Sequence, residues 1–387
     1  MVSVLLQSVV PVTINYDKIV EENIFAYELL GFLKPKESAA GLFRARQILN
    51  KRFGNVYVTL TNPIPVRNYF ANHLCSSSLS PSPSVRLSDS DVMAIRRFAH
   101  DIICIHNRHN VVTLWPYICV AILQAIDHQK DSCSPTIKME EVRSTVTALL
   151  SLSDLFGLRY HIQRSVDADF GYYFQLHANL FTCETDIASS TCVFRLSEFP
   201  IEKDGIMKKE FLSQCVTPII LNNYANQVLP QYCDLSILSL ILIAVKNHSL
   251  SSVKELFGMV KKLLRFEFIY VPDQEEECFI SAFSLVQEKS YILCDGEQII
   301  VSRSHELSTV ASLVLPFVAV YQIVQLTAFS FIGATVSQSD LIVGCQKKIV
   351  HSLSTGTSAL RLCSLSSDTI KNAISSLTEH KALIKQV

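Results

Sequence analysis

The chain has 387 residues, with 34 lysines and arginines against 35 aspartates and glutamates, so its formal net charge is −1. This balance gives no excess of positive charge for sequence-independent contact with nucleic acid, and we expect no such partner. Hydrophobic residues make up 49% and charged residues 18%; this composition excludes a disordered or fibrous protein and, with a mean hydropathy of +0.28, leaves membrane association open.

The twelve cysteines are spread singly along the chain, and no C-x-x-C pair occurs. Disulfide frameworks are typical of short secreted chains with paired spacings. We therefore expect mostly buried thiols in a reducing compartment. The first ten residues lack the basic region of a secretory signal, so we expect no such leader.

A serine- and proline-rich segment divides the sequence. Residues 75–91 hold eight serines and two prolines, too little apolar surface for a core. This pattern predicts a linker at 75–91, between an N-terminal region at 1–74 and a C-terminal domain at 92–387.

Before the linker, the sequence predicts the order strand, helix, helix, strand. β-Branched alternation indicates strands over 10–17 and 55–60, and helical spacing indicates helices over 18–30 and 41–53. Two strands alone do not form a stable sheet. We interpret the region as an α/β remnant of a domain whose first half is missing.

After the linker, the pattern indicates a mainly α-helical domain with a few short strands, which is the α+β class. Helices are predicted over 91–105, 111–126, 138–155, 235–245, 251–265 and 307–332, with a closing helix from 366. Short strands are predicted over 266–271, 291–294 and 298–301.

The segment 307–339 carries no charge over 33 residues. Its length alone permits a transmembrane helix. Proline, glutamine and hydroxyl side chains interrupt it, so we expect a buried or interfacial helix rather than a full span.

The densest set of potential metal ligands is Cys104, His106 and His109. Zinc sites usually take four ligands, and no second half with matching spacing follows. A polar helix end is therefore the expected interpretation, with no metal site. No phosphate-binding glycine loop, G-x-S-x-G or H-E-x-x-H motif occurs.

Cations gather after the first predicted helix, at Lys34, Lys36 and Arg44. Arg46, Lys51 and Arg52 follow in the same predicted helix or just beyond it. Beside the end of an α/β sheet, such cations can hold a phosphate or the tail of coenzyme A. The alternative is a solvated helix face.

Residues 10–49 resemble the glycerol-3-phosphate and dihydroxyacetone-phosphate acyltransferases, more closely the dihydroxyacetone-phosphate branch. The resemblance covers most of the chain and is weak over 132–137 and 151–231. It continues at FGNVYV (53–58), VVTLWPYICVAILQ (111–124), RFEFIYVPDQEEECF (265–279), VLPFVAVYQIV (314–324) and STGTSALRLCSLSSDTIKNAISSL (354–377).

The family's acyltransferase domain has four sequence blocks. The fourth matches Val10, Pro11, Tyr16 and Asp17, which the resemblance assigns to the acceptor or acyl-CoA site rather than to proton transfer. The first block is a His-x-x-x-x-Asp, in which the histidine is the general base on the acceptor hydroxyl. None of the eleven histidines here has an aspartate five positions on, and no Glu-Gly-Thr of the third block occurs.

The resemblance therefore implies the C-terminal part of an enzyme that transfers a fatty acyl group from acyl-CoA to dihydroxyacetone phosphate in ether-lipid synthesis. It implies no cofactor beyond acyl-CoA as co-substrate. We expect the chain alone to be inactive. We interpret Met1 as an internal start or as the start of a truncated gene model. One alternative is a non-catalytic protein that binds a membrane or a partner; another is a glycerol-3-phosphate acyltransferase.

The resemblance also implies a membrane-associated peroxisomal protein, with peripheral membrane contact and a complex with the next ether-lipid enzyme. The last three residues, KQV, are not an S-K-L-type tripeptide.

Overall fold

The computed structural model describes residues 7–32, 46, 50–71, 88–127, 135–186, 191–201, 207–245, 249–271, 274–355 and 359–384. Within these ranges the chain is mostly helical, with short strands in small antiparallel sheets, which confirms the predicted α+β class. The cations Lys34, Lys36 and Arg44 lie outside the described residues. So do most of the predicted linker and most of the helix predicted over 41–53.

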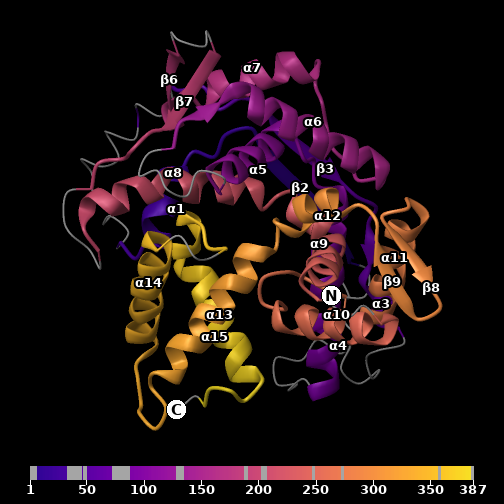
Figure 1. Ribbon diagram of the computed structural model, residues 1–387. Coiled ribbons are helices and arrows are strands. Elements are labelled where there is room, and N and C mark those ends of the chain that lie inside the picture. The colour runs from indigo at the N-terminus through magenta and orange to yellow at the C-terminus, as the bar shows by residue number, and fades with distance from the viewer. Residues whose placement is uncertain are drawn as a thin grey trace.

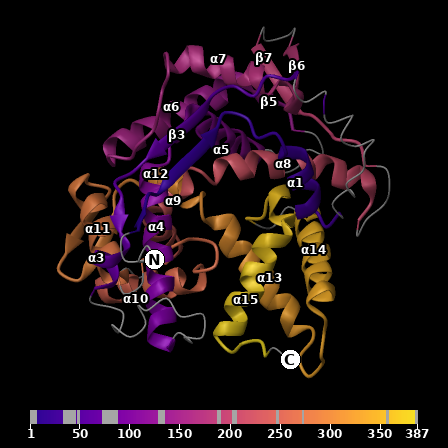
Figure 2. The same ribbon diagram turned by 180° about the vertical axis from the view of Figure 1, so that it is seen from behind.

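Among its described residues, the N-terminal region contributes two small sheets and two helices. One sheet pairs β1 with β4, and the other pairs β2 with β3 so that Val12 lies opposite Leu60. The β2–β3 sheet lies on the near side of the molecule in Figure 2, where β3 is labelled. The elements are β1 (Ser8–Val9), β2 (Val12–Tyr16), α1 (Glu22–Leu29), β3 (Val56–Leu60), β4 (Ile64–Pro65) and α3 (Val66–Phe70).

The helix α5 (Leu114–Asp127) forms the centre of the core. Nearly all its side chains are buried, including Trp115 and Tyr117. A helix that is apolar on every side can only be stable when other elements surround it. Three helices pack against α5: α6 (Met139–Leu155), α7 (Val166–Leu176) and α8 (Lys209–Ala225).

A three-stranded antiparallel sheet of order β5-β7-β6 lies beside these helices. Its strand β7 contacts α6 and α8. The elements are β5 (Ile137–Lys138), the short 3₁₀ helix η4 (Ala178–Leu180), β6 (Phe181–Asp186) and β7 (Thr191–Leu196).

The remaining elements form two lobes below α5 and α8 (Figure 1). One lobe contains α4 (Asp89–His109), α9 (Leu229–Ala244), α10 (Leu250–Leu263), α11 (Glu275–Glu288), β8 (Ile292–Asp295), β9 (Gln298–Val301) and α12 (Ser304–Ala311). The other, called the C-terminal lobe below, contains α13 (Leu315–Phe329), α14 (Gln338–Ser354), η5 (Leu362–Leu365) and α15 (Ser367–Glu379).

Serine side chains fix the starts of four helices, α4, α7, α10 and α14. Each accepts a hydrogen bond from the backbone N–H three residues on, which satisfies a donor that the helix cannot pair internally. The four are Ser88, Ser165, Ser249 and Ser337.

Two predictions are wrong. No strand forms over 266–271, because the N–H groups of Glu267 and Phe268 both donate to the carbonyl oxygen of Leu264, at 2.9 and 3.2 Å, and close a turn. The single helix predicted over 307–332 is two helices, α12 and α13, bent by 59°. Pro316 lies in the first turn of α13, where its missing N–H is tolerated and a new helix begins.

The strands predicted over 10–17, 55–60, 291–294 and 298–301 are confirmed as β2, β3, β8 and β9. The helices α1, α4, α5, α6, α9, α10 and α15 were also predicted, and α4 begins two residues before the predicted Asp91. The sequence patterns did not indicate α7, α8, α11, α14 or the hairpin of β6 and β7.

No single helix of the described ranges has both the length and the apolar composition to cross a bilayer. Two bent pairs meet these criteria only when taken together: α8 with α9, at 95°, and α12 with α13.

Candidate functional site

The four positions that match the family's fourth block lie along and just beyond β2. Pro11 and Asp17 are buried, whereas Val10 is 41% exposed and Tyr16 is 46% exposed. Successive side chains of a strand alternate between its two sides, so the four residues do not share one surface. Val10 and Tyr16 face outward, and Pro11 and Asp17 face the helices.

The sheet of β2 and β3 reverses the usual amphipathic pattern, in which apolar side chains face the core. Its outward side chains are apolar and 38–69% exposed: Val12, Ile14, Val56, Val58 and Leu60. This face would be unfavourable in water unless something covers it.

The inward side chains of β2 are polar and hydrogen-bonded to the helical region. Thr13 Oγ1 donates to the carbonyl oxygen of His109 at 3.3 Å. Asn15 Nδ2 donates to the carbonyl oxygen of Val111 at 2.5 Å and to Oε1 of Gln227 at 3.0 Å. The strand is therefore held by specific polar contacts, which fix its position and register.

Asp17, just after β2, has a fully buried side chain. Its carboxylate accepts more hydrogen bonds than the side chain of either Thr13 or Asn15 makes. Its Oδ2 accepts hydrogen bonds from the Asn55 backbone N–H and Nδ2, both at 2.8 Å, and from the Tyr172 hydroxyl at 3.0 Å. Its Oδ1 accepts from the Tyr173 hydroxyl at 2.8 Å. Burial, followed by the nearby carboxylate, raises the pKa of Tyr172 to about 12, so this hydroxyl stays a donor.

Gly54 allows this close approach. Its φ is +75°, and a Cβ at this position would lie 2.6 Å from both Asp17 Cβ and the Tyr172 hydroxyl oxygen. Any other residue would have to displace the carboxylate or the tyrosine.

A second buried carboxylate, that of Glu22 on α1, continues the network. Its Oε2 accepts from the Tyr224 hydroxyl at 2.8 Å, and the same hydroxyl accepts from the Ile19 N–H at 2.8 Å. Lys18 Nζ lies 3.8 Å from Glu22 Oε1 and donates to the Leu176 carbonyl oxygen at 3.0 Å. These contacts attach α1 to α7 and α8.

His177 completes the network at the end of α7. Its Nε2 donates to the carbonyl oxygen of Asp17 at 3.0 Å, and its ring stacks on Trp115 with centroids 3.9 Å apart. Burial, with a smaller contribution from Lys18, lowers the pKa of His177 to about 3, so the ring is neutral. We call Asp17, Lys18, Glu22, Asn55, Tyr172, Tyr173, His177 and Tyr224 the anchor cluster.

The anchor cluster can position the strand but offers no group for acid–base chemistry on a bound substrate. The Asp17 carboxylate is enclosed by four donors, and the His177 ring is fully buried. A general base must reach the proton it removes. The cluster is therefore structural, and it fixes where Val10 and Tyr16 face outward.

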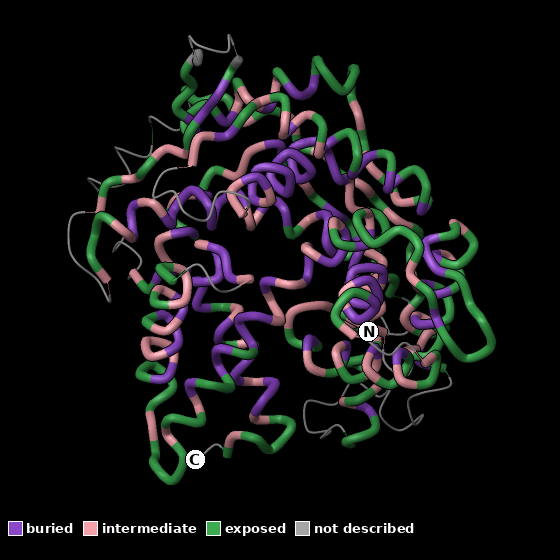
Figure 3. The backbone as a smooth tube through the Cα atoms, in the orientation of Figure 1, coloured by how far each residue is buried: buried purple, intermediate pink, exposed green. Residues whose placement is uncertain are grey.

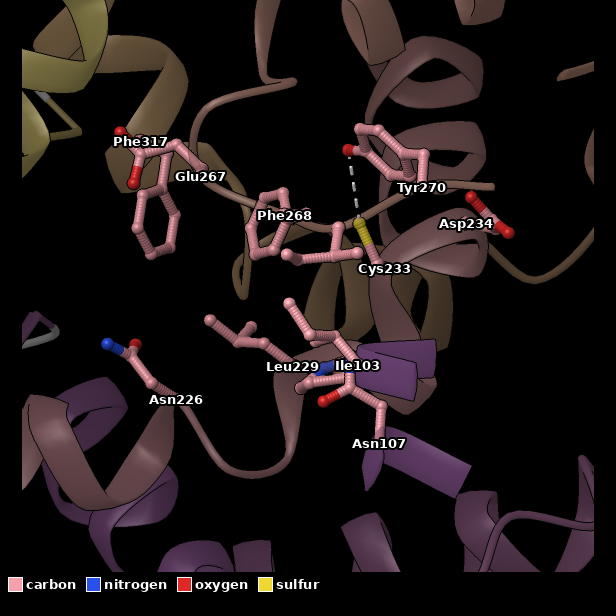
Figure 4. A pocket seen from close by; sticks show the side chains of 12 residues that line it. Ile103, Asn107, Asn226, Leu229, Cys233, Asp234, Glu267, Phe268, Tyr270 and Phe317 are labelled. Carbon is pink, nitrogen blue, oxygen red and sulfur yellow. Dashed lines mark hydrogen bonds between the residues drawn. The ribbon is translucent and has the colours of Figure 1, made fainter. Parts of the chain in front are cut away.

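A separate cavity of about 280 Å³ lies between α4, α9, α13 and the turn after α10 (Figure 4). Ile103, Leu229, Phe268 and Phe317 give it apolar walls. The carboxylate of Asp234 points away from it in Figure 4 and pairs with Lys261 Nζ at 2.8 Å.

The polar groups of this cavity are not ionised nucleophiles. Burial raises the pKa of Cys233 to about 12, and its Sγ lies 3.5 Å from the Tyr270 hydroxyl. Glu267 Oε2 accepts from Asn372 Nδ2 at 3.1 Å. The cavity suits an uncharged, mostly apolar group.

No metal centre forms among the residues that the structure describes. Cys104, His106 and His109 lie on α4, but no group of three or more histidine, cysteine, aspartate or glutamate side chains there could hold a metal ion. The ten cysteines of these ranges are free thiols.

The partners of Asp17 and Glu22 were not predicted from the sequence. Tyr172, Tyr173 and His177 follow Asp17, and Tyr224 follows Glu22, by 155 to 202 residues, and no local motif links them. One sign of them is present in the sequence: Thr13 and Asn15, on the inward side of β2, are polar and need polar partners elsewhere in the chain.

Comparison with known proteins gives one family. The model described as glycerol-3-phosphate acyltransferase C-terminal region matches residues 25–386. The dihydroxyacetone phosphate acyltransferases of Homo sapiens and Oryctolagus cuniculus are 27% and 25% identical to the chain over 380 residues, which is 94% of this chain and 52% of each relative. A glycerol-3-phosphate acyltransferase of Haemophilus ducreyi is 37% identical over 79 residues, 20% of this chain and 10% of that relative. The chain thus spans about half the length of the first two relatives.

The substitution Asp17→Asn tests the anchor cluster. An amide places an N–H₂ group where the carboxylate accepts, so at least one donor loses its partner in the buried site. We expect the free energy of unfolding to fall by about 3 kcal/mol in urea titrations. Asp295→Asn, on the exposed turn of the β8–β9 hairpin, is the matched control. Equal small changes in both variants would contradict the structural role of Asp17.

Glu267 predicts a pH dependence of stability. Burial raises its pKa from 4.5 to about 7 in the folded protein. The associated stabilisation is complete below pH 4.5 and is lost as the pH rises through about 7, because the charged form is then buried. Relative to Glu267→Gln, the wild type should lose up to roughly 3 kcal/mol between pH 5 and 8. Parallel pH profiles for both proteins, or the same divergence with the exposed control Glu277→Gln, would show this to be wrong.

Proposed function

The chain belongs to the family of glycerol-3-phosphate acyltransferase C-terminal regions, and from this membership we propose that it is the C-terminal part of a dihydroxyacetone-phosphate O-acyltransferase. The complete enzyme transfers a fatty acyl group from acyl-CoA to dihydroxyacetone phosphate, in ether glycerophospholipid synthesis. The breadth of the similarity supports this acceptor. Dihydroxyacetone phosphate acyltransferases match 94% of the chain, against 20% for the Haemophilus ducreyi glycerol-3-phosphate acyltransferase.

In this reaction the acceptor hydroxyl oxygen attacks the thioester carbon of acyl-CoA. The new C–O ester bond forms, the C–S bond breaks, the hydroxyl proton passes to a general base, and coenzyme A leaves as a thiolate that takes up a proton. The reaction needs no metal or redox cofactor, and acyl-CoA is a co-substrate. The His-x-x-x-x-Asp that carries the base in the family does not occur in this sequence, so we propose that the chain alone is inactive.

The outward apolar face of β2 and β3 supports a specific role for this half of the enzyme. Val12, Ile14, Val56, Val58 and Leu60 form an exposed apolar surface on a strand pair that is anchored from behind. The relatives carry as much chain again as this one matches. We propose that their N-terminal half packs on this face and extends the sheet.

The same arrangement gives the fourth-block residues two roles in the proposal. Val10 and Tyr16 face outward and help to shape the substrate site, whereas Pro11 and Asp17 hold the strand in place. Lys34, Lys36 and Arg44, which follow α1, are proposed contacts for the substrate phosphate or for coenzyme A.

We propose a peroxisomal, membrane-associated location and a complex with the next enzyme of ether-lipid synthesis, following the dihydroxyacetone-phosphate assignment. Exposed apolar residues at the end of the C-terminal lobe favour peripheral membrane contact in particular. The alternative functions are a glycerol-3-phosphate acceptor and a non-catalytic protein that binds a membrane or a partner.

Sequencing the 5′ end of the transcript separates these functions. An upstream in-frame segment with His-x-x-x-x-Asp and Glu-Gly-Thr supports the acyltransferase. A transcript that starts at Met1 overturns it in favour of the non-catalytic protein. Parallel assays with dihydroxyacetone phosphate and glycerol 3-phosphate then identify the acceptor of the complete enzyme.

The purified 387-residue chain should transfer no acyl group from palmitoyl-CoA to dihydroxyacetone phosphate. The reason is the missing general base, which is typically worth about 10²- to 10⁴-fold in rate. Radiolabelled product is counted against a blank without protein. Product clearly above the blank would contradict the proposed inactivity and place a base elsewhere in the chain.

In the complete enzyme, Val58→Lys should lower activity at least about tenfold, because it buries an unpaired charge between the two halves. Leu293→Lys, on the β8–β9 hairpin, is the control; the two side chains are 54% and 55% exposed in this chain. Full activity of the Val58→Lys enzyme would mean that the β2–β3 face stays open to solvent.

A further inference from the structure

The C-terminal lobe ends in a projecting group of exposed apolar side chains. Leu326 and Phe329 lie in the last turn of α13, Ile332 lies in the connection to α14, and Ile384 follows α15. They are 45%, 57%, 77% and 88% exposed. Figures 1 and 2 both place the α13–α14 connection near the segment that follows α15, and Figure 3 colours this end of the lobe as exposed. We call these four residues the apolar tip.

Charges of both signs lie near the apolar tip, and the exposed Asp340, in the first turn of α14, lies between the tip and the lysines of that helix. No charged residue occurs from 307 to 339, so the α13–α14 connection itself is neutral. The cations lie behind it: Lys348 Nζ donates to the carbonyl oxygen of Leu326 at 3.1 Å, and Lys347 and Lys381 are exposed nearby in sequence. The nearest acid on α14, Asp340, accepts a hydrogen bond from the Ser337 hydroxyl at 2.6 Å at the helix start.

Exposed apolar side chains with more lysines than acids behind them suit a lipid surface. Apolar groups lower their free energy by entering the boundary between headgroups and acyl chains, and lysines are attracted to anionic headgroups. The tip is also a projecting turn, which a deformable lipid layer can receive without a complementary shape. In contrast, the β2–β3 face is a paired sheet surface held from behind by the anchor cluster.

We propose that the apolar tip inserts into anionic lipid surfaces and orients the C-terminal lobe toward the membrane. The inference rests on the peripheral membrane contact proposed above and names the residues that make it. It does not depend on the acyltransferase reaction, since binding to lipid needs neither substrate nor general base.

Co-sedimentation with vesicles tests this inference on the full 387-residue chain. The vesicles are phosphatidylcholine, with or without phosphatidylserine. We expect binding that increases with phosphatidylserine, and a loss of at least about tenfold in the partition coefficient for the double substitution Phe329→Ser and Ile332→Ser. The matched control, Ile280→Ser and Leu293→Ser, changes residues that are 53% and 55% exposed elsewhere and should bind as the wild type does.

Charge and self-association complete the test. Lys347→Glu with Lys381→Glu should remove the preference for phosphatidylserine. Unchanged binding of the Phe329→Ser, Ile332→Ser chain would show that the apolar tip is not the part that inserts into the lipid, while membrane contact itself would stand. No binding of the wild type to either vesicle would overturn both and leave the acyltransferase proposal untouched. A dimer that the tip substitution dissociates, without vesicle binding, would assign the tip to a second copy of the chain.

Discussion

The buried carboxylate of Asp17 is the constraint on which the arrangement of the N-terminal strands depends. Four donors from Asn55, Tyr172 and Tyr173 enclose it, and the backbone carbonyl of the same residue accepts a hydrogen bond from His177. A buried charge is tolerated only when its hydrogen bonds are complete, so strand and helices must meet in one register. Gly54 leaves space for this carboxylate. Glu22, on the following helix α1, is a second buried carboxylate that accepts a hydrogen bond from a tyrosine hydroxyl, that of Tyr224.

This constraint explains why the β2–β3 sheet has its apolar side chains on the solvent side, the reverse of what an isolated domain would have. Its inward side chains are polar because they bond to helices, and its apolar side chains are left to face outward. The chain spans about half the length of the dihydroxyacetone phosphate acyltransferases that it matches, and we propose that further chain of the complete enzyme covers this face. In the function that we propose, the contribution of this chain is positional: it holds in place a strand whose outward residues help to shape the substrate site.

Local patterns predicted much of the fold. Periodicity indicated α5 and α10, and alternation indicated β2 and β3, because these elements bury or expose side chains in a regular order. The patterns failed where tertiary contacts decide the conformation. The apolar run RFEFIYV looks like a strand, yet two N–H groups share the Leu264 carbonyl and form a turn. The anchor cluster could not be predicted, since partners such as Glu22 and Tyr224 are 202 residues apart in the sequence. The polar inward residues of β2 indicate that such partners exist but do not identify them.

Hydrogen exchange of β2 measured by mass spectrometry tests the central claim, that the N-terminal strands are one unit with the helical domain. If the anchor cluster fixes them, the amides of β2 that hydrogen-bond to β3 should exchange as slowly as those of α5, and both should become faster together in urea. Rapid exchange in β2 while α5 remains protected would contradict the account, because the strand would then open without disturbing the helices that are said to hold it.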